Sequence, residues 1–274
     1  MIFRVIRNFL DKDIIIKIFN FKVYGSVKKN NTSYFLLKKC EFGDDHEMET
    51  ISRISKYNKV LLLDCGANYG FYSFYTASIS SGNKVIAVEA SKNTSAFFLK
   101  NLELNNLKNI SFHNMAISSQ DNIEVTFNES KNDWESSLTH NNYVSGLEEK
   151  IKTCKIDTLL KKYNLRDYIL LFKLDIEGNE INAIRGGNKI ISEFSPVIII
   201  EFSKFIFDKK ENTDYLIEFL INFDYQIYDT NKNKLDIKDV LFKLDQLTKR
   251  HKTIGNFYLI KNDSKQLELF EKND

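Results

Sequence analysis

The sequence has little cysteine and almost no proline. Its three cysteines, Cys40, Cys65 and Cys154, lie far apart and form no C-x-x-C pair, and one proline occurs in 274 residues. An odd, scattered set of cysteines argues against a disulfide framework or a zinc knuckle and favours a reducing compartment. We therefore expect a cytoplasmic protein.

Long apolar runs and an excess of one charge are also missing. No apolar run approaches the ~20 residues that cross a bilayer, so the sequence predicts no transmembrane segment. With 39 basic and 37 acidic residues the net charge is +2, which gives no global electrostatic reason to bind nucleic acid. Apolar content of 43% and charged content of 28% are typical of a globular protein.

The first 21 residues mix apolar and charged positions, so they do not read as a signal peptide. Ile2, Val5, Ile6 and Phe9 can form one face of an amphipathic helix. Such a helix docks on the rest of the chain or, as the alternative, makes peripheral contact with a membrane through residues 1–21.

The chain divides into three parts. Residues 1–58 form an N-terminal extension, in which alternation from Phe21 to Val27 and an apolar run from Tyr34 to Leu37 predict a hairpin. Residues 59–261 form the main domain, with a polar loop or lid at 127–150 and a basic, helical insertion at 230–252. Residues 262–274 are a loosely ordered tail.

One stretch, Val60 to Gly70 (VLLLDCGANYG), carries the strongest signal. An apolar strand ends in Asp64, and a turn bounded by Gly66 and Gly70 leads into a helix. The spacing is G-x-x-x-G and not the dinucleotide fingerprint G-x-G-x-x-G. An acid at the strand tip repels a pyrophosphate but suits an amino group, such as that of S-adenosylmethionine. We assign Asp64, Gly66, Ala67, Asn68 and Gly70 to cofactor binding.

Strands and helices then alternate, which predicts a doubly wound, mostly parallel α/β sheet with helices on both faces. Four predicted strands end in an acid: Asp64, Glu89, Asp175 and Glu201. In such sheets ligands bind beyond the carboxyl ends of the strands, so these four acids should face one crevice.

The second strand places Glu89 where an acid accepts hydrogen bonds from two ribose hydroxyls. A solvated carboxylate at a strand end is the alternative. Ala90, next in the chain, belongs to the same cofactor-binding set. Asn114 and Ala116 follow the third strand, where an adenine ring would lie, and are the weaker assignments.

A second dense cluster, KLDIEGNE, follows the fourth core strand. We assign Asp175 as the first candidate base for a hydroxyl acceptor and Glu201 as the second, with Lys173 holding either carboxylate in place. Glu177 is assigned to the acceptor. Acids that cap the next helix are the alternative. A metal between Asp175, Glu177 and Glu201 is conceivable, but we expect none.

The polar loop supplies the remaining acceptor candidates, Trp134, Ser137 and His140. A single tryptophan in a polar loop stacks on a sugar ring or, equally, anchors the loop to the core.

These motifs, in this order, resemble the FkbM family of S-adenosylmethionine-dependent methyltransferases. The resemblance rests on LLLDCGANYGFYS, VIAVEAS, Asn105, NMAI, IDTL, KLDIEGNE, and Pro196 with IIIEF, and covers Val60 to Phe202. It implies a seven-stranded class I, Rossmann-like fold and O-methylation of a hydroxyl, with natural products and surface-glycan sugars among the family's acceptors.

Two other functions remain open at this stage. One is an NAD-dependent oxidoreductase, against which the missing fingerprint and the acid at the strand tip both argue. The other is a catalytically silent cofactor-binding protein on the same fold.

Overall fold

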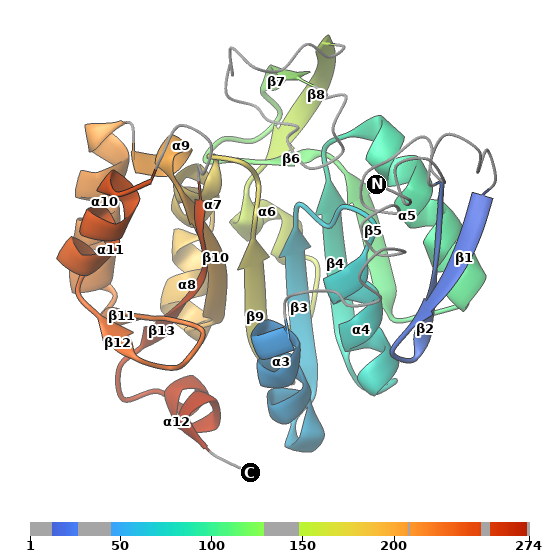
Figure 1. Ribbon diagram of the computed structural model, residues 1–274, viewed down its shortest axis with the longest axis horizontal. Coiled ribbons are helices and arrows are strands. Elements are labelled where there is room, and N and C mark those ends of the chain that lie inside the picture. Colours follow the sequence, from blue (N-terminus) through green and yellow to red (C-terminus); the bar gives the residue numbers. More distant parts are fainter. Residues whose placement is uncertain (1–12, 27–44, 129–147, 208, 248–252, 273–274) are drawn as a thin grey trace, which may run out of the picture.

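The computed structural model describes residues 13–26, 45–128, 148–207, 209–247 and 253–272. Within them lie a large central sheet, a hairpin and a small three-stranded sheet (Figure 1). No helix in the described part of the chain is both long and apolar enough to cross a membrane.

The central sheet has eight strands in the order β12-β11-β13-β10-β9-β3-β4-β5. Five neighbours, β10, β9, β3, β4 and β5, are parallel, and β13 runs antiparallel between β10 and β11. The strands are β3 (Val60–Cys65), β4 (Lys84–Glu89), β5 (Ile110–Asn114), β9 (Ile169–Leu174), β10 (Val197–Ser203), β11 (Tyr225–Tyr228), β12 (Lys234–Leu235) and β13 (Thr253–Lys261). The predicted doubly wound, mostly parallel sheet is confirmed. The two-residue strand β12 brings the number of strands from the expected seven to eight.

Helices cover both faces of this sheet. They are α3 (Asp45–Tyr57), α4 (Phe71–Ile79), α5 (Lys92–Asn105), α6 (Ile156–Leu160), α7 (Glu180–Gly186), α8 (Asn188–Phe194), α9 (Lys204–Phe207), α10 (Lys210–Asn222), α11 (Ile237–Asp245) and α12 (Lys265–Glu271). One apolar core contains residues of α3, α4, α5 and α12, and the other contains residues of α6, α7, α8, α10 and α11. Central strands such as β3 are therefore buried on both faces, which explains their unbroken apolar runs.

The C-terminal segment corrects one prediction. Residues 262–274 were expected to be loosely ordered, but α12 is a helix with its start capped by the Ser264 side chain. Phe270 is fully buried and packs on the rings of Tyr228 and Tyr258. Leu267 and Leu269 also pack against this core. These contacts hold the helix in place, and the polar residues around them made the pattern hard to recognise in the sequence.

The N-terminal hairpin differs from the predicted one. β2 (Phe21–Ser26) is the expected strand, but it pairs with β1 (Asp13–Ile18), to which the sequence analysis assigned no strand. The β-branched run in β1 favours a strand. The expected partner, Tyr34 to Leu37, and the helical face Ile2, Val5, Ile6 and Phe9 lie outside the described residues.

The hairpin is attached to the domain by side chains of α5. Asn105 accepts a hydrogen bond from the backbone of Lys22 and donates one back, at 2.7 Å each. Asn101 accepts from the backbone N–H of Tyr24 at 2.6 Å, and Phe21 and Val23 are buried beneath. Two asparagines on one helix face thus substitute for a neighbouring strand.

The small sheet has the order β6-β8-β7, from β6 (Ala116–Ile117), β7 (Glu124–Asn128) and β8 (Glu148–Cys154). It lies above the central sheet in Figure 1. Residues at both ends of the loop predicted at 127–150 are instead in strands, Phe127 and Asn128 in β7 and residues 148–150 in β8. The rest of that loop lies outside the described residues.

Candidate active site

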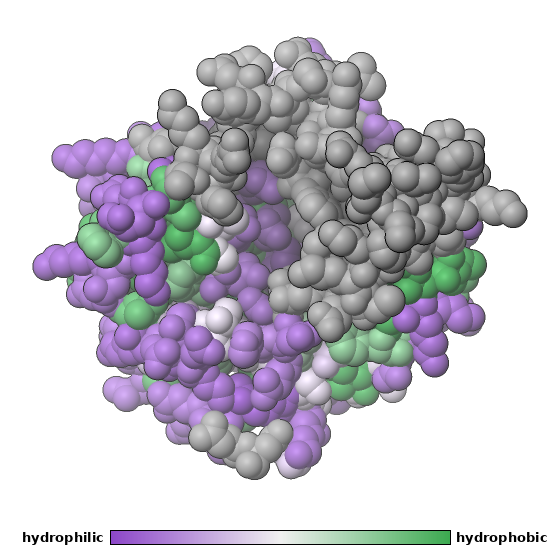
Figure 2. Space-filling view, in the orientation of Figure 1, coloured by the Kyte–Doolittle hydropathy of each residue, from purple (hydrophilic) through white to green (hydrophobic). Residues whose placement is uncertain are grey.

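The four acids predicted to share a crevice come from four adjacent parallel strands. Asp64 lies in β3, Glu89 ends β4, Asp175 follows β9 and Glu201 lies in β10. Because β10, β9, β3 and β4 are neighbours and run the same way, their carboxyl ends meet at one edge of the sheet, uppermost in Figure 1. The space-filling view shows hydrophilic surface in a recess near that edge (Figure 2).

The glycine turn after β3 is tightly packed against its neighbours. Gly66 has φ +76°, and a Cβ there would lie 1.9 Å from the backbone oxygen of Asp175. The N–H groups of Gly66 and Ala67 both donate to the carbonyl of Val88 at 3.0 Å. Gly70 also has a positive φ, +91°. The sequence analysis assigned Gly66 to cofactor binding; the structure adds that Gly66 lies close to the backbone at the end of β9.

The side chain of Asp64 is 1% exposed, and only one of its two carboxylate oxygens has a hydrogen-bond partner among the described residues. The hydroxyl of Ser73, on α4, donates to its Oδ2 at 2.6 Å. Its Oδ1 is buried and accepts no hydrogen bond from any described residue. Burial raises the pKa of this carboxyl, and the nearby Lys173 opposes the rise. Sequence reasoning missed Ser73, although its place in the first turn of a helix after the glycine turn was a usable signal.

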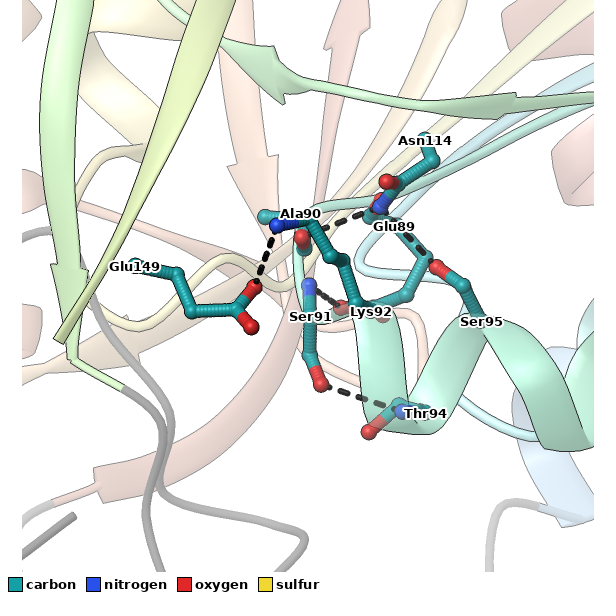
Figure 3. Close-up of polar contacts among 8 residues, drawn as sticks. All are labelled: Glu89, Ala90, Ser91, Lys92, Thr94, Ser95, Asn114 and Glu149. Atoms are coloured by element: carbon teal, nitrogen blue, oxygen red, sulfur yellow. Dashed lines mark hydrogen bonds and ion pairs between the residues drawn. The ribbon is translucent and has the colours of Figure 1, made fainter. Parts of the chain in front are cut away.

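Glu89 is held by two backbone donors, one of which, Ser91, is drawn in Figure 3. Its Oε2 accepts from the N–H of Asn68 at 2.9 Å and its Oε1 from the N–H of Ser91 at 2.8 Å. Burial raises the pKa of Glu89 to about 7, and these hydrogen bonds limit the rise. Its carboxylate is therefore fixed in orientation, beside the turn that carries Asn68.

Asn114 has a structural part in the same corner (Figure 3). Its amide nitrogen donates to the carbonyls of Glu89 and Ala90, at 2.8 and 3.0 Å, and to the hydroxyl of Ser95 at 3.0 Å. It therefore ties the end of β5 to the end of β4 and the start of α5.

Ala116, the other residue assigned to adenine, is 3% exposed. It packs with Phe127 and Ile151 of the small sheet, and Ala90 joins this apolar cluster. The cluster connects the small sheet to the end of β4, beside Glu89.

Lys173 is a buried cation among the acids. It is 5% exposed and lies opposite Asp64 in the β3–β9 register. Its ammonium is 2.9 Å from Oδ2 of Asp175 and 5.0 Å from the ring centroid of Tyr72. A buried lysine is costly unless paired, so this ion pair and the neighbouring acids explain its presence.

Glu201 and Glu180 complete the acidic cluster. Burial, with the charges of Asp175 and Glu180, raises the pKa of Glu201 to about 8. Glu180 is 1% exposed; its Oε1 accepts from the N–H groups of Ile176 and Gly178, and burial raises its pKa to about 7. The sequence analysis gave acids that cap the next helix as the alternative for this cluster, and Glu180, the first residue of α7, makes backbone contacts of this kind.

Asp175, Glu177 and Glu201 each offer a carboxylate oxygen, and these oxygens lie within 4.8 Å of one another. Across the described ranges no other group of three such residues is close enough to hold a metal ion. Asp175 already pairs with Lys173, so a positive charge is built into the cluster.

Three acceptor candidates, Trp134, Ser137 and His140, lie outside the described residues. The strand that follows them is anchored to the start of α5. Glu149 of β8 pairs with Lys92, at the start of α5, over 3.3 Å (Figure 3). The small sheet thus contacts the same corner as Glu89.

Comparisons with known proteins identify a family. A family described as "Methyltransferase FkbM domain" matches residues 64–227, more than half of the chain. No curated protein matches.

Among solved structures, FkbM from Methylobacillus flagellatus KT is 18% identical and covers 83% of this chain and 52% of its own, with a TM-score of 0.44. This chain therefore spans about half of that protein. Precorrin-6y C5,15-methyltransferase from Geobacter metallireducens GS-15 is 13% identical and covers 81% of this chain and 89% of its own, with a TM-score of 0.41. M. jannaschii TYW2 in complex with AdoMet is 13% identical and covers 91% of this chain and 84% of its own, with a TM-score of 0.43.

The family match begins at Asp64, spans Glu89, Lys173, Asp175 and Glu201, and ends in β11. This chain therefore belongs to the FkbM methyltransferase domain family.

Proposed function

We propose that this protein is an S-adenosylmethionine-dependent methyltransferase that methylates a hydroxyl, on a sugar of a surface glycan or a related small molecule. The observation that carries the proposal is the buried, unpaired oxygen of Asp64 at the glycine turn. An unpaired buried carboxylate oxygen is costly, and a cationic donor supplied by a ligand relieves the cost.

The residues present fit this cofactor. Asp64 Oδ1 is free to accept from its amino group, and the turn formed by Gly66, Ala67, Asn68 and Gly70 lies beside it. Glu89 is oriented to accept the two ribose hydroxyls, since its two backbone donors leave lone pairs on both oxygens.

Ala90, Asn114 and Ala116 keep their assignment to the adenine end of the cofactor. Asn114 sits at the exposed end of β5, next to Ala90, while Ala116 is buried below. Asn114 and Ala116 thus act mainly by shaping this corner, through the amide contacts of Asn114 and the apolar cluster around Ala116.

The cofactor, when bound, supplies an electrophilic methyl group on a sulfonium. The chain must then orient the acceptor hydroxyl and remove its proton. Glu201 suits this step, because its raised pKa makes its ionised form a strong base for a carboxylate. Asp175 suits it less well, because it is already engaged by Lys173. The order of the two candidates from the sequence is therefore reversed in our proposal.

The acceptor side is assigned to Glu177 together with Trp134, Ser137 and His140. Glu177 lies within the carboxylate group around Glu201, so it can accept a hydrogen bond from a second hydroxyl of a sugar. Neighbouring hydroxyls are common in glycans, which favours this class of acceptor.

The proposal includes the division of the chain into an extension (1–58), a methyltransferase domain (59–261) and a C-terminal segment, in a reducing cytoplasm. Among the described residues both cysteines, Cys65 and Cys154, are free thiols. Family membership favours a methyltransferase over the oxidoreductase alternative.

A turnover assay tests the proposal. S-adenosylhomocysteine formation is measured with S-adenosylmethionine and a panel of monosaccharides, oligosaccharides and simple alcohols. We expect turnover with a hydroxylated acceptor, slowed about 100-fold or more by Glu201→Gln and little by Glu193→Gln on the exposed face of α8. Cofactor binding without turnover on any acceptor would favour the silent-protein alternative.

A further inference from the structure

Among the described residues, the outer edge of β1 has no neighbouring strand, and its strand carries exposed apolar side chains. Within the described ranges β1 pairs only with β2, which leaves its second edge without a strand (Figure 1). Ile15 is 58% exposed and Phe19, in the hairpin turn, is 46% exposed. Figure 2 shows hydrophobic surface on this side of the molecule. Natural proteins protect such edges or use them for pairing.

One of the two charged residues of β1 lies opposite a like charge within the same chain. The strand reads DIIIKI, so Asp13 and Lys17 are its only charged residues. Lys17 lies directly opposite Lys22 of β2, and like charges in opposed positions destabilise a strand pair. Lys17 has no ion-pair partner in the described part of the chain, while Asp13 accepts a hydrogen bond from the hydroxyl of Tyr24.

We propose that two copies of this chain pair antiparallel along β1, centred on Ile15. In this register Lys17 lies opposite the partner's Asp13, and Asp13 lies opposite the partner's Lys17. A two-fold axis passes between the two copies of Ile15, which then bury each other's exposed surface. The result is an isologous dimer with a continuous four-stranded sheet, β2-β1-β1-β2.

The register follows from the four-residue spacing of Asp13 and Lys17. Moving the centre by one residue, to Ile16, places Lys17 opposite Ile15 and leaves both charges unpaired. Centring on Ile15 is the one antiparallel arrangement that satisfies the two charges of each chain together.

Charge reversal tests the dimer, with molar mass measured by light scattering over a range of protein concentrations. In a dimer of Lys17→Asp chains, Asp13 of each copy lies opposite the new acid of the other copy. In a dimer of Asp13→Lys chains, Lys17 of each copy lies opposite the new base of the other copy. Each variant alone should weaken the dimer about tenfold or more. An equimolar mixture of the two should dimerise again, because every opposed pair across the axis then has unlike charges.

Lys210→Asp, at the start of α10 on the far side of the molecule, makes the same charge change as Lys17→Asp and should leave the dimer intact. Thermal unfolding confirms that each variant folds. The proposal is overturned by a wild-type chain that stays monomeric at every concentration. It is also overturned if Lys17→Asp leaves dimerisation unchanged, or if the mixture fails to restore it.

Discussion

Asp64 and Lys173 are opposed residues on adjacent parallel strands, β3 and β9. Lys173 also forms a 2.9 Å ion pair with Asp175, so one buried lysine is paired with a candidate base and lies opposite the acid assigned to the cofactor. Its positive charge lowers the pKa values of Asp64, Glu89 and Glu201 against the effect of burial. Both halves of the proposed site therefore depend on this one side chain.

Replacing that side chain should be costly. Lys173→Met leaves Asp175 and the other buried acids near it without a neighbouring cation. We therefore expect the free energy of unfolding to fall by about 2 kcal/mol or more at pH 8. The cost should stay below that of a fully buried pair, since the Asp175 side chain is 36% exposed. Urea unfolding measures it. Lys150→Met, which breaks an exposed pair with Glu124, is the control and should have little effect. Equal losses in the two variants would contradict the central role of Lys173.

The stability of the unliganded protein should fall as pH rises from about 5 to about 8. Glu89 and Glu180 have pKa values raised to about 7, and Glu201 to about 8. The folded state thus holds protons that the unfolded state has released above about 4.5, so raising the pH favours unfolding. Denaturant midpoints at pH 5.5 and 8 measure this, and Glu201→Gln should flatten the difference. A midpoint that rises over this range would be opposite to the expected sign.

Cofactor affinity should show the reverse dependence on pH. Only the ionised form of Glu89 accepts hydrogen bonds from two ribose hydroxyls on both oxygens, so affinity for S-adenosylmethionine should increase as pH passes through about 7. Glu89→Gln should bind more weakly and lose most of this pH dependence. Fluorescence titrations from pH 6 to 8.5 test it; the same pH profile in the variant and the wild type would remove Glu89 from the ribose site.

Gly66, in the glycine turn, and Gly255, in β13, offer a matched pair of substitutions. Gly66→Ala combines a positive φ with a Cβ 1.9 Å from the Asp175 backbone oxygen, whereas Gly255→Ala has a positive φ but nothing within 4 Å of the new Cβ. Strain at positive φ costs about 1–3 kcal/mol, so Gly255→Ala should lose about that much and Gly66→Ala clearly more. Thermal unfolding of the two variants separates the cost of the steric clash at Gly66 from the cost of the positive φ that both positions share. Equal losses would show that β9 is not packed against this turn.

Removal of divalent metal should leave turnover unchanged. The carboxylates of Asp175, Glu177 and Glu201 are close together, but the ammonium of Lys173 already neutralises part of their charge. Dialysis against EDTA, followed by the turnover assay with and without added Mg²⁺, measures this. Activity that is lost with EDTA and restored by Mg²⁺ would show that these carboxylates hold a cation.

The sequence predicted the central sheet well because strong local signals mark it. The apolar run before Asp64 is typical of a strand that is buried on both faces of a sheet. The acids at four strand ends mark the carboxyl ends of parallel strands, where ligands bind in such sheets. The hairpin and the C-terminal segment were harder. Strand β1 is fixed by its attachment through β2 to Asn101 and Asn105, and α12 by the burial of Phe270, and both are contacts between distant parts of the chain.

Within the site, the sequence indicated which acids gather but not how each one is held. The Ser73 hydroxyl on Asp64 and the backbone donors to Glu89 depend on the folded geometry of the turn. Likewise, the higher rank of Glu201 as a base comes from its burial near Asp175 and Glu180, which spacing along the chain does not show.

The most direct test of this account is calorimetric titration of S-adenosylmethionine into the wild type and Asp64→Asn. Asparagine keeps the size of the side chain and can still accept from Ser73, but it removes the negative charge offered to the amino group. We predict saturable binding by the wild type and affinity at least about tenfold weaker in the variant. Equal affinity in both proteins, with the variant still folded by circular dichroism, would contradict the central claim that Asp64 binds the cofactor.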